Sequence, residues 1–308
     1  MFGRCSFRSL SGGGAVAGGM VTTALALALA VPAAAQAPTT YRRAPGDTLR
    51  YHELTEGKSE SKGQMGGTSS EIRREATVGL TFLGGDDAQA WFEALSATMK
   101  AQGRENAMPT EGVLNRPFAL RFGANGEVQV EAGPGPGASI AQLFPKLPER
   151  PLAPGVEWAD TSGDKRDTPD GAHVESQLVV RYRVLGDTAV AGGRALVIAA
   201  KGEGSSRRSS KGTDGASMES RTRTTETGRI VFSTDAGRLL SWEKTVEQTG
   251  RTTARTGSED HSAPMARNPN QRVEIGNAAD RRATELHDRM HTLIELLPAP
   301  AKAAPATP

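Results

Sequence analysis

A strict alternation of apolar and polar residues runs through the middle of this chain and constrains its fold more than any other feature. In Ala76-Thr-Val-Gly-Leu-Thr-Phe82 every second side chain is apolar, and residues 118–122 repeat the pattern. Successive side chains of a strand point to opposite faces, so this period predicts strands with one buried face. Parallel strands covered on both faces would read as continuous apolar runs, so we expect these half-exposed strands to pair antiparallel. Further strands are predicted around residues 178–184, 196–200, 230–232 and 240–242.

Turn residues connect these predicted strands. Asn125-Gly126 lies between two alternating runs, and both residue types tolerate the positive φ of a tight hairpin. A similar strand-turn-strand phrase, from Phe232 to Leu239, follows the one from Phe122 to Val128. This echo favours two related β halves, 47–150 and 151–260, although shared turn chemistry alone also explains it.

Two segments have helical periodicity. Residues 87–101 carry apolar side chains at 88, 91, 92, 95 and 99, which predicts a helix, but their partial alternation leaves a strand open for 87–102. In 277–297, Leu286, Met290, Leu293 and Leu297 step by four, three and four, which predicts a C-terminal helix after a linker that begins at 261. The expected fold is therefore α+β and mainly β: one large curved antiparallel sheet with one or two amphipathic helices.

The N-terminus has the pattern of a secretory signal peptide. Arg4 and Arg8 precede a short apolar run, and Ala33-Ala-Ala35 supplies a small-residue cleavage site. We therefore expect residues 1–35 to be removed and the protein to be exported, to the periplasm or beyond the cell. Residues 36–46 form a mature N-terminal arm, and the Pro/Ala-rich residues 298–308 are expected to be a disordered tail. No other stretch approaches the roughly 20 apolar residues of a membrane helix, so no transmembrane segment is expected in the mature chain.

Charge balance argues against a nucleic-acid partner, and cysteine content argues against a fold held by disulfides. Cleavage removes two of the 37 Lys and Arg residues and none of the 35 Asp and Glu residues, so the mature chain is formally neutral. That balance argues against nucleic acid as a partner, because a nucleic-acid-binding chain is expected to be basic. The one cysteine, Cys5, leaves with the signal peptide, so an ordinary core must hold the fold.

The stretch "ELHDRMH" (285–291) resembles a zinc-protease signature. His287 and His291 have the four-residue spacing that brings two imidazoles to one metal on a helix. Asp288 replaces the usual glutamate, and no third histidine follows, so we predict no metal site. Nor does the sequence contain a Gly-x-Ser-x-Gly elbow or a phosphate-binding loop. We therefore predict no catalytic residues, no cofactor and no enzymatic activity.

Two surfaces are candidates for binding. A concave apolar sheet is predicted to hold a lipid or a lipoprotein segment, although its lining side chains would equally fill a core. That lining consists of Phe82, Leu120, Phe122, Trp158, Tyr182 and Trp242. The alternative is an adaptor or envelope-assembly protein that docks a partner through its sheet edges and the basic hairpin around 201–212, with Arg207, Arg208 and Lys211 as candidates.

The phrases "NRPFALRFGANGEVQV" (115–130) and "LFPKLPERPLAPGVEW" (143–158) resemble segments of uncharacterised secreted or lipid-anchored bacterial β domains, a family of unknown function. More distantly, the arrangement resembles periplasmic lipoprotein carriers, whose curved antiparallel sheet wraps helices around an apolar cavity. This resemblance implies the fold, and it implies a carrier role only by analogy. Because Cys5 precedes the apolar run, the chain lacks the acylated cysteine of the anchored members.

Overall fold

A computed structural model describes residues 39–63, 66–110, 112–130, 140, 142–168, 171–190, 193–212, 216–255 and 281–298, without the side chains of 281 and 282. They belong to one compact unit, Ala37–Pro308. The predicted signal peptide, the linker up to 280 and the tail from 299 lie outside the described residues. No helix among those described is long and apolar enough to cross a membrane.

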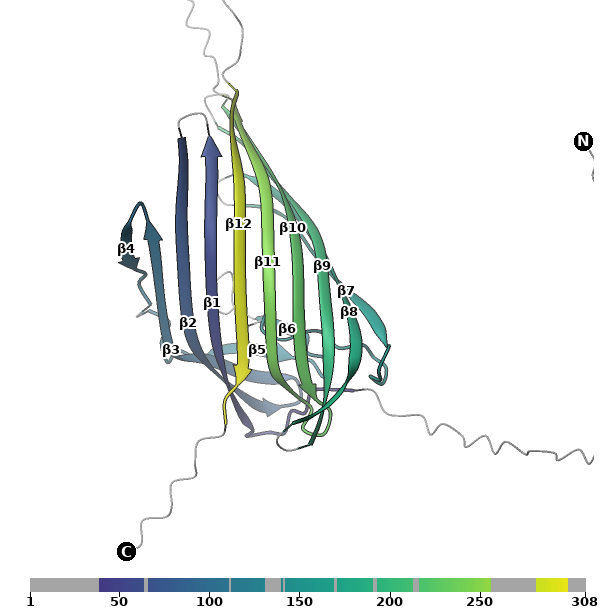
Figure 1. Ribbon diagram of the computed structural model, residues 1–308. Helices are drawn as coiled ribbons and strands as arrows, with labels where there is room; N and C mark the ends of the chain where they lie inside the picture. The colour runs from purple at the N-terminus through teal and green to yellow at the C-terminus, as the bar shows by residue number, and fades with distance from the viewer. Residues whose placement is uncertain are drawn as a thin grey trace, which may run out of the picture. The chain divides into compact units, whose positions relative to one another are not determined.

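The structure is a single antiparallel sheet of twelve strands (Figure 1). The strands are β1 (Thr48–Gly63), β2 (Gly66–Gly84), β3 (Asp87–Ala101), β4 (Arg104–Ala107), β5 (Phe118–Phe122), β6 (Val128–Val130), β7 (Glu157–Asp167), β8 (His173–Val190), β9 (Gly193–Lys211), β10 (Ser217–Ser233), β11 (Arg238–Arg255) and β12 (Arg281–Leu296). Their order is β6-β5-β3-β2-β1-β12-β11-β10-β9-β8-β7, with β4 beside β3. The C-terminal strand β12 therefore joins the strands of residues 48–130 to those of residues 157–255.

The expected α+β class is wrong, because the protein is all-β. Among the described residues, helical geometry occurs only at Ile140. Residues 87–101 form β3, and the segment predicted as the C-terminal helix forms β12. The antiparallel pairing is confirmed, as is the Asn125-Gly126 hairpin, in which Gly126 has a φ of 88°.

The apolar residues of both segments have helical spacing in the sequence because they lie on both faces of a strand. In β3 a bulge opposite Thr77 and Val78 shifts the alternation, so Phe92 and Leu95 both contact the core. In β12 the register is continuous, and Leu293 lies on the opposite face from the buried Ile294, directly across from Leu54 of β1. Steps of three and four residues result in each case without a helical turn.

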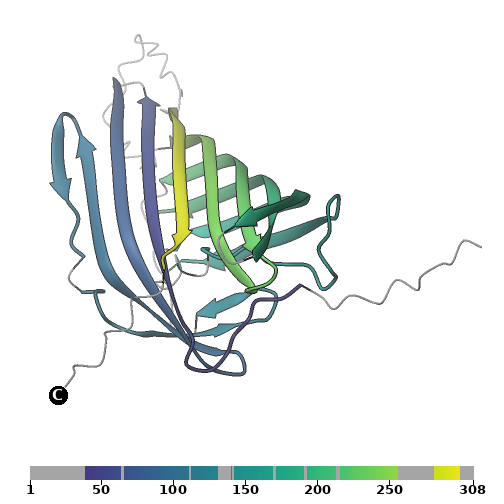
Figure 2. The ribbon, with the colours of Figure 1, turned by 60° about the horizontal axis from the view of Figure 1, so that its bottom comes forward.

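The core lies on one face of the sheet, which we call the inner face. Figure 2 shows how the sheet curves around this side. It contains Tyr51, Val78, Ile198 and Ile230, each at most 1% exposed. The connection between β6 and β7 covers this face through four further buried residues: Leu143, Phe144, Leu147 and Leu152. Edge-to-face aromatic contacts join the two layers, with the Phe122 and Phe144 rings 4.9 Å apart.

The N-terminal arm completes the core. Tyr41 is buried between Phe122 and Phe232, at ring distances of 5.3 and 5.1 Å. These two phenylalanines begin the two similar turn phrases of the sequence. Tyr41 packs so closely on Gly126 that a side chain there would collide with its ring, and Gly237 approaches Arg42 in the same way.

Candidate functional site

The six candidate lining residues lie in or against the core. Phe82, Leu120, Phe122, Tyr182 and Trp242 are at most 5% exposed and belong to the buried cluster. Trp158 is half-buried, stacks on Tyr182 at 5.0 Å, and donates its indole N–H to the Lys146 carbonyl at 2.9 Å. The connection from β6 to β7 thus packs on the apolar surface that these residues form, and the hollows described below are lined by other residues.

A belt of charged side chains borders this core on the inner face. Arg74 donates to Glu53 at 2.7 Å, and the Lys244 ammonium lies 4.5 Å from the Trp242 ring centroid. Burial lowers the pKa of Lys244 and raises that of Glu226, while each of the two charges favours the ionised form of the other. The Arg74–Glu53 ion pair and the mutual attraction of the Lys244 and Glu226 charges reduce the cost of burying charged groups beside the core.

The two histidines of "ELHDRMH" lie on the outer face of β12. Glu60 and Glu56 of β1 are their partners in the register, and His291 approaches Glu243 at 3.1 Å. Four residues along a strand span about 13 Å, so the imidazoles cannot share one metal ion. Within the described part of the chain, no three His, Cys, Asp or Glu side chains could hold a metal ion together.

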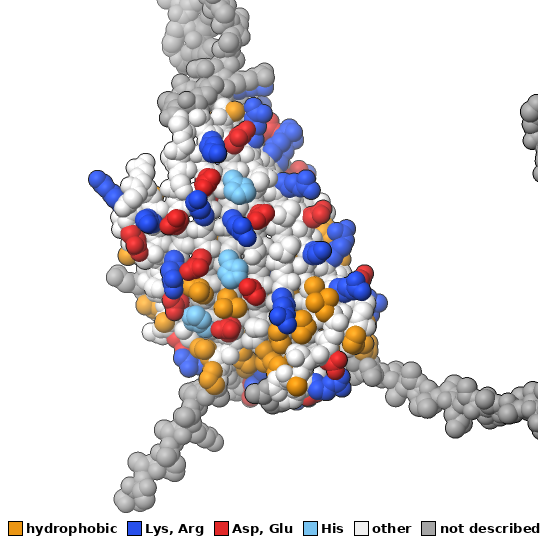
Figure 3. Space-filling view, viewed as in Figure 1, with side chains coloured by type: hydrophobic (Ala, Val, Ile, Leu, Met, Phe, Trp, Pro, Cys, Tyr) orange, Lys and Arg blue, Asp and Glu red, His pale blue; other side chains and the backbone are white. Residues whose placement is uncertain are grey.

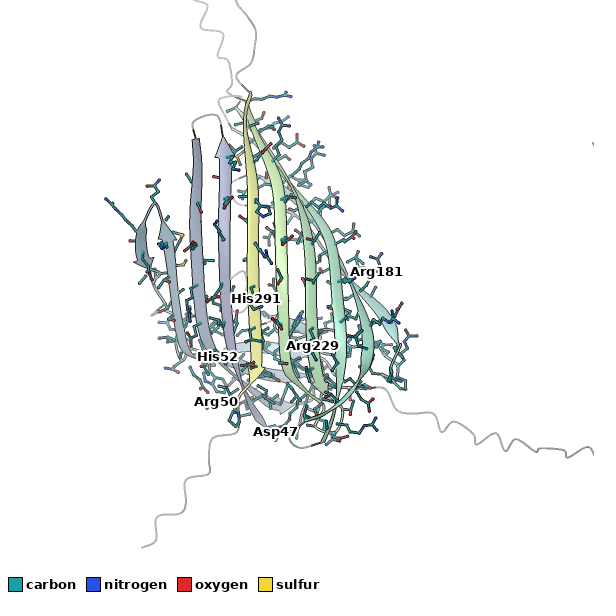
Figure 4. All side chains as sticks on the ribbon, viewed as in Figure 1. Asp47, Arg50, His52, Arg181, Arg229 and His291 are labelled. Carbon is teal, nitrogen blue, oxygen red and sulfur yellow. The ribbon has the colours of Figure 1, made fainter. Side chains whose placement is uncertain are left out.

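The outer face divides into two halves with different charge patterns. On β1, β2 and β12 acidic and basic side chains alternate, as in Arg73–Glu56 at 3.0 Å and Lys58–Glu60 at 2.7 Å. We call this the balanced half. Figure 3 shows the two signs intermingled over these strands, and Figure 4 places His52 and His291 among them.

On β8, β9 and β10 the outer face is strongly basic, and we call it the basic half. Between 175–183, 201–211 and 219–229, its outward positions hold eight Lys or Arg and three Glu. The cations are Arg181, Arg183, Lys201, Arg207, Lys211, Arg221, Arg223 and Arg229, and the carboxylates are Glu175, Glu203 and Glu219. Figure 3 shows Lys and Arg gathered over these strands, and Figure 4 labels Arg181 and Arg229.

The three basic candidate residues predicted from the sequence lie on different faces of the sheet. Arg207 and Lys211 lie on the outer face, whereas Arg208 lies on the inner face because neighbouring strand residues point oppositely. Arg207 and Arg221 share Glu219, with N···O distances of 3.0 and 2.9 Å. The hydrogen bond from Arg221, and then the charge of Arg207, hold the pKa of Glu219 below its ordinary value.

Two open hollows meet at Arg207. One, of about 640 Å³, is lined by Arg207, Arg221 and Lys165 together with Gln177 and Ser205. The other, of about 430 Å³, adds Lys211, Arg255, Ser209 and Thr253. Arg221 and its neighbours were not predicted as site residues. Their signal in the sequence is the alternation of Arg221 and Arg223, but only the register of β10 against β9 places Arg221 opposite Arg207.

Comparison with known proteins gives no family. No protein-family model matches the chain, and no curated protein matches its sequence. Among solved structures, Pseudomonas aeruginosa OccK5 (OpdH) is similar with 8% identity and a TM-score of 0.25, over 82% of this chain and 98% of that one. A BenF-like porin from Pseudomonas fluorescens Pf-5 has 8% identity and a TM-score of 0.20, over 82% and 100%. TM-scores this low carry no argument about this chain.

Proposed function

We propose that this chain is a non-enzymatic exported protein that docks an anionic partner on the basic half of its sheet. The observation that carries the proposal is the excess of eight cations over three carboxylates on three neighbouring strands. The expected mature chain is formally neutral, so this excess is a local arrangement and not a consequence of overall composition. A concentrated positive field attracts anionic partners and orients them during encounter.

The filled inner face supports docking through the outer face. Phe122 and Trp242, predicted to line a lipid site, are 1% and 5% exposed and pack within the core. A lipid would have to displace Phe144 and its neighbours, which lie on that surface. The basic side chains need no such rearrangement, because Arg207 and Arg221 are more than half exposed.

Retention on a carboxylate-bearing resin at neutral pH tests this proposal. The mature protein should be retained and should elute later than the variant Arg207→Gln/Arg221→Gln/Arg223→Gln. A control variant, Lys58→Gln/Arg73→Gln/Arg289→Gln, loses the same charge from the balanced half and should elute close to the wild type. Equal elution of the two triple variants, both folded by circular dichroism, would overturn the proposal.

A further inference from the structure

Three arginines form a straight row across the outer face. Arg207 of β9 is directly opposite Arg221 of β10, and Arg221 is directly opposite Arg251 of β11. Adjacent strands lie about 4.8 Å apart, so the row presents three guanidinium groups at a regular interval. Glu175 and Glu285 bound the row on β8 and β12.

The row places like charges side by side on neighbouring strands. Like charges directly opposite each other destabilise a pair of strands, and here the arrangement occurs twice in succession. Glu219 offsets part of the repulsion by accepting from Arg207 and Arg221. Local choices that oppose stability are expected at functional positions, so the row is a candidate binding element within the basic half.

The surroundings of the row are polar and hollowed. The hollows at Arg207 expose the hydroxyls of Ser205, Ser209 and Thr253 and the amide of Gln177. On the other side, Arg251 and Lys62 line a third hollow of about 580 Å³ together with Glu60 and Glu285. A ligand that follows the row thus meets three guanidinium groups, neutral hydrogen-bonding groups beside them, and carboxylates at the two ends of the row.

This lining distinguishes among anionic ligands. The exposed large apolar residues of the described chain are Leu83, Met99, Met108, Leu185, Met218 and Met290. Of these, Met218 alone borders a hollow at Arg207, and it lies on the inner face of β10, opposite Ser210. A membrane surface would therefore find no apolar side chain on the outer face of these hollows to insert. The outward positions of the basic half hold no aromatic residue on which nucleotide bases could stack.

We propose that Arg207, Arg221 and Arg251 bind successive carboxylates of an acidic polysaccharide, whose hydroxyls bond to Ser205, Ser209 and Gln177. This inference rests on the proposed function and names the partner's chemistry. Guanidinium groups match carboxylates in a bidentate geometry, and neutral hydroxyl and amide groups match the remainder of a sugar. Each open hollow by itself would bind a sugar unit only weakly. A polymer of repeating units gains affinity because it binds several hollows at once.

The test is calorimetric titration of the mature protein with polygalacturonate, with polyglutamate of matched charge, and with phosphatidylglycerol vesicles. Polygalacturonate should bind most tightly. Arg207→Gln/Arg221→Gln/Arg251→Gln should weaken it at least about tenfold, while Lys58→Gln/Arg73→Gln/Arg289→Gln should change it less than about twofold. Ser205→Ala/Ser209→Ala should weaken polygalacturonate and leave polyglutamate unchanged.

The outcomes separate this inference from the proposed function. Equal binding of the two polymers, with no effect of the serine variant, would overturn the polysaccharide and leave a general anion-docking surface. Tighter binding to vesicles would likewise overturn the polysaccharide in favour of a membrane. Failure of all three probes to bind would overturn both proposals.

Discussion

At the scale of single residues, Glu226 shows how the charged belt limits stability. Burial raises the pKa of this carboxyl, and the nearby Lys244 charge only partly opposes the shift. A raised folded-state pKa means that the contribution of Glu226 is fully present below its unfolded pKa and is lost as pH rises through the folded value. Glutamine imitates the protonated form at every pH.

We therefore expect Glu226→Gln to gain free energy of unfolding relative to the wild type as pH rises from about 4 to about 8. Urea unfolding at several pH values measures this difference. Glu203→Gln, an exposed change on the neighbouring strand, serves as the control and should show no such trend. If the difference in free energy of unfolding between Glu226→Gln and the wild type stays the same at every pH, the raised pKa of Glu226 is contradicted.

Gly79 of β2 is a second position where one residue decides local packing. It is buried and directly opposite Trp91 of β3, whose indole occupies the space that a Cβ would need. Gly79→Ala should therefore displace the indole and cost about 1–3 kcal/mol, as overpacking does elsewhere. Trp91 fluorescence and a denaturation curve together measure the effect. Ala119→Gly on the exposed side of β5 should leave Trp91 fluorescence unchanged.

At the scale of elements, β12 is central although its sequence resembled a helix. Thr292 pairs with Thr55 of β1 on one side and Lys244 of β11 on the other, so its N–H must belong to a ladder. Thr292→Pro should cost at least about 1–3 kcal/mol, because it removes a buried donor from its acceptor. Thr161→Pro should cost less, because β7 is the last strand in the order of the described sheet and has β8 as its neighbour there. If urea unfolding shows that Thr292→Pro and Thr161→Pro lose similar free energies of unfolding, the central role of β12 is contradicted.

The sequence predicts some strands of the sheet correctly and two others, β3 and β12, as helices. Alternation predicts the strand at 76–82, where only one face is apolar, and the strands at 178–184 and 196–200, where buried side chains recur at every second position. It failed in β3, where a bulge changes which face is buried, and in β12, where Leu293 is apolar on the outer face. Pairing with neighbours overrides local helical preference in both strands, and those neighbours are distant in the chain.

The candidate site was only partly predictable for a related reason. Arg207 and Lys211 stood out as a basic run, but the row with Arg221 and Arg251 depends on the register of three strands. A shift of one residue in either pairing would move the partner arginine to the inner face. The sequence thus contained the charges, and the register determined which of them act together.

At the scale of the whole molecule, the arm containing Tyr41 joins parts that are distant in sequence. Its N–H donates to Ala124 at 2.8 Å, its hydroxyl donates to Pro145 at 3.0 Å, and its ring lies between Phe122 and Phe232. The arm therefore stabilises the strands on both sides of β12, and its loss should weaken both sides together.

Tyr41→Ala should lower the free energy of unfolding by about 3–5 kcal/mol, as for other large aromatic deletions in cores. Tyr41→Phe removes only the hydroxyl and leaves the Pro145 carbonyl without this donor, so it should cost about 1 kcal/mol. Variants in which Trp91 or Trp158 is the single remaining tryptophan give fluorescence signals that report separately on β3 and on β7. Both fluorescence midpoints should fall together in Tyr41→Ala, because the sheet is continuous through β12. Movement of one midpoint alone would show that the two sides unfold as independent units.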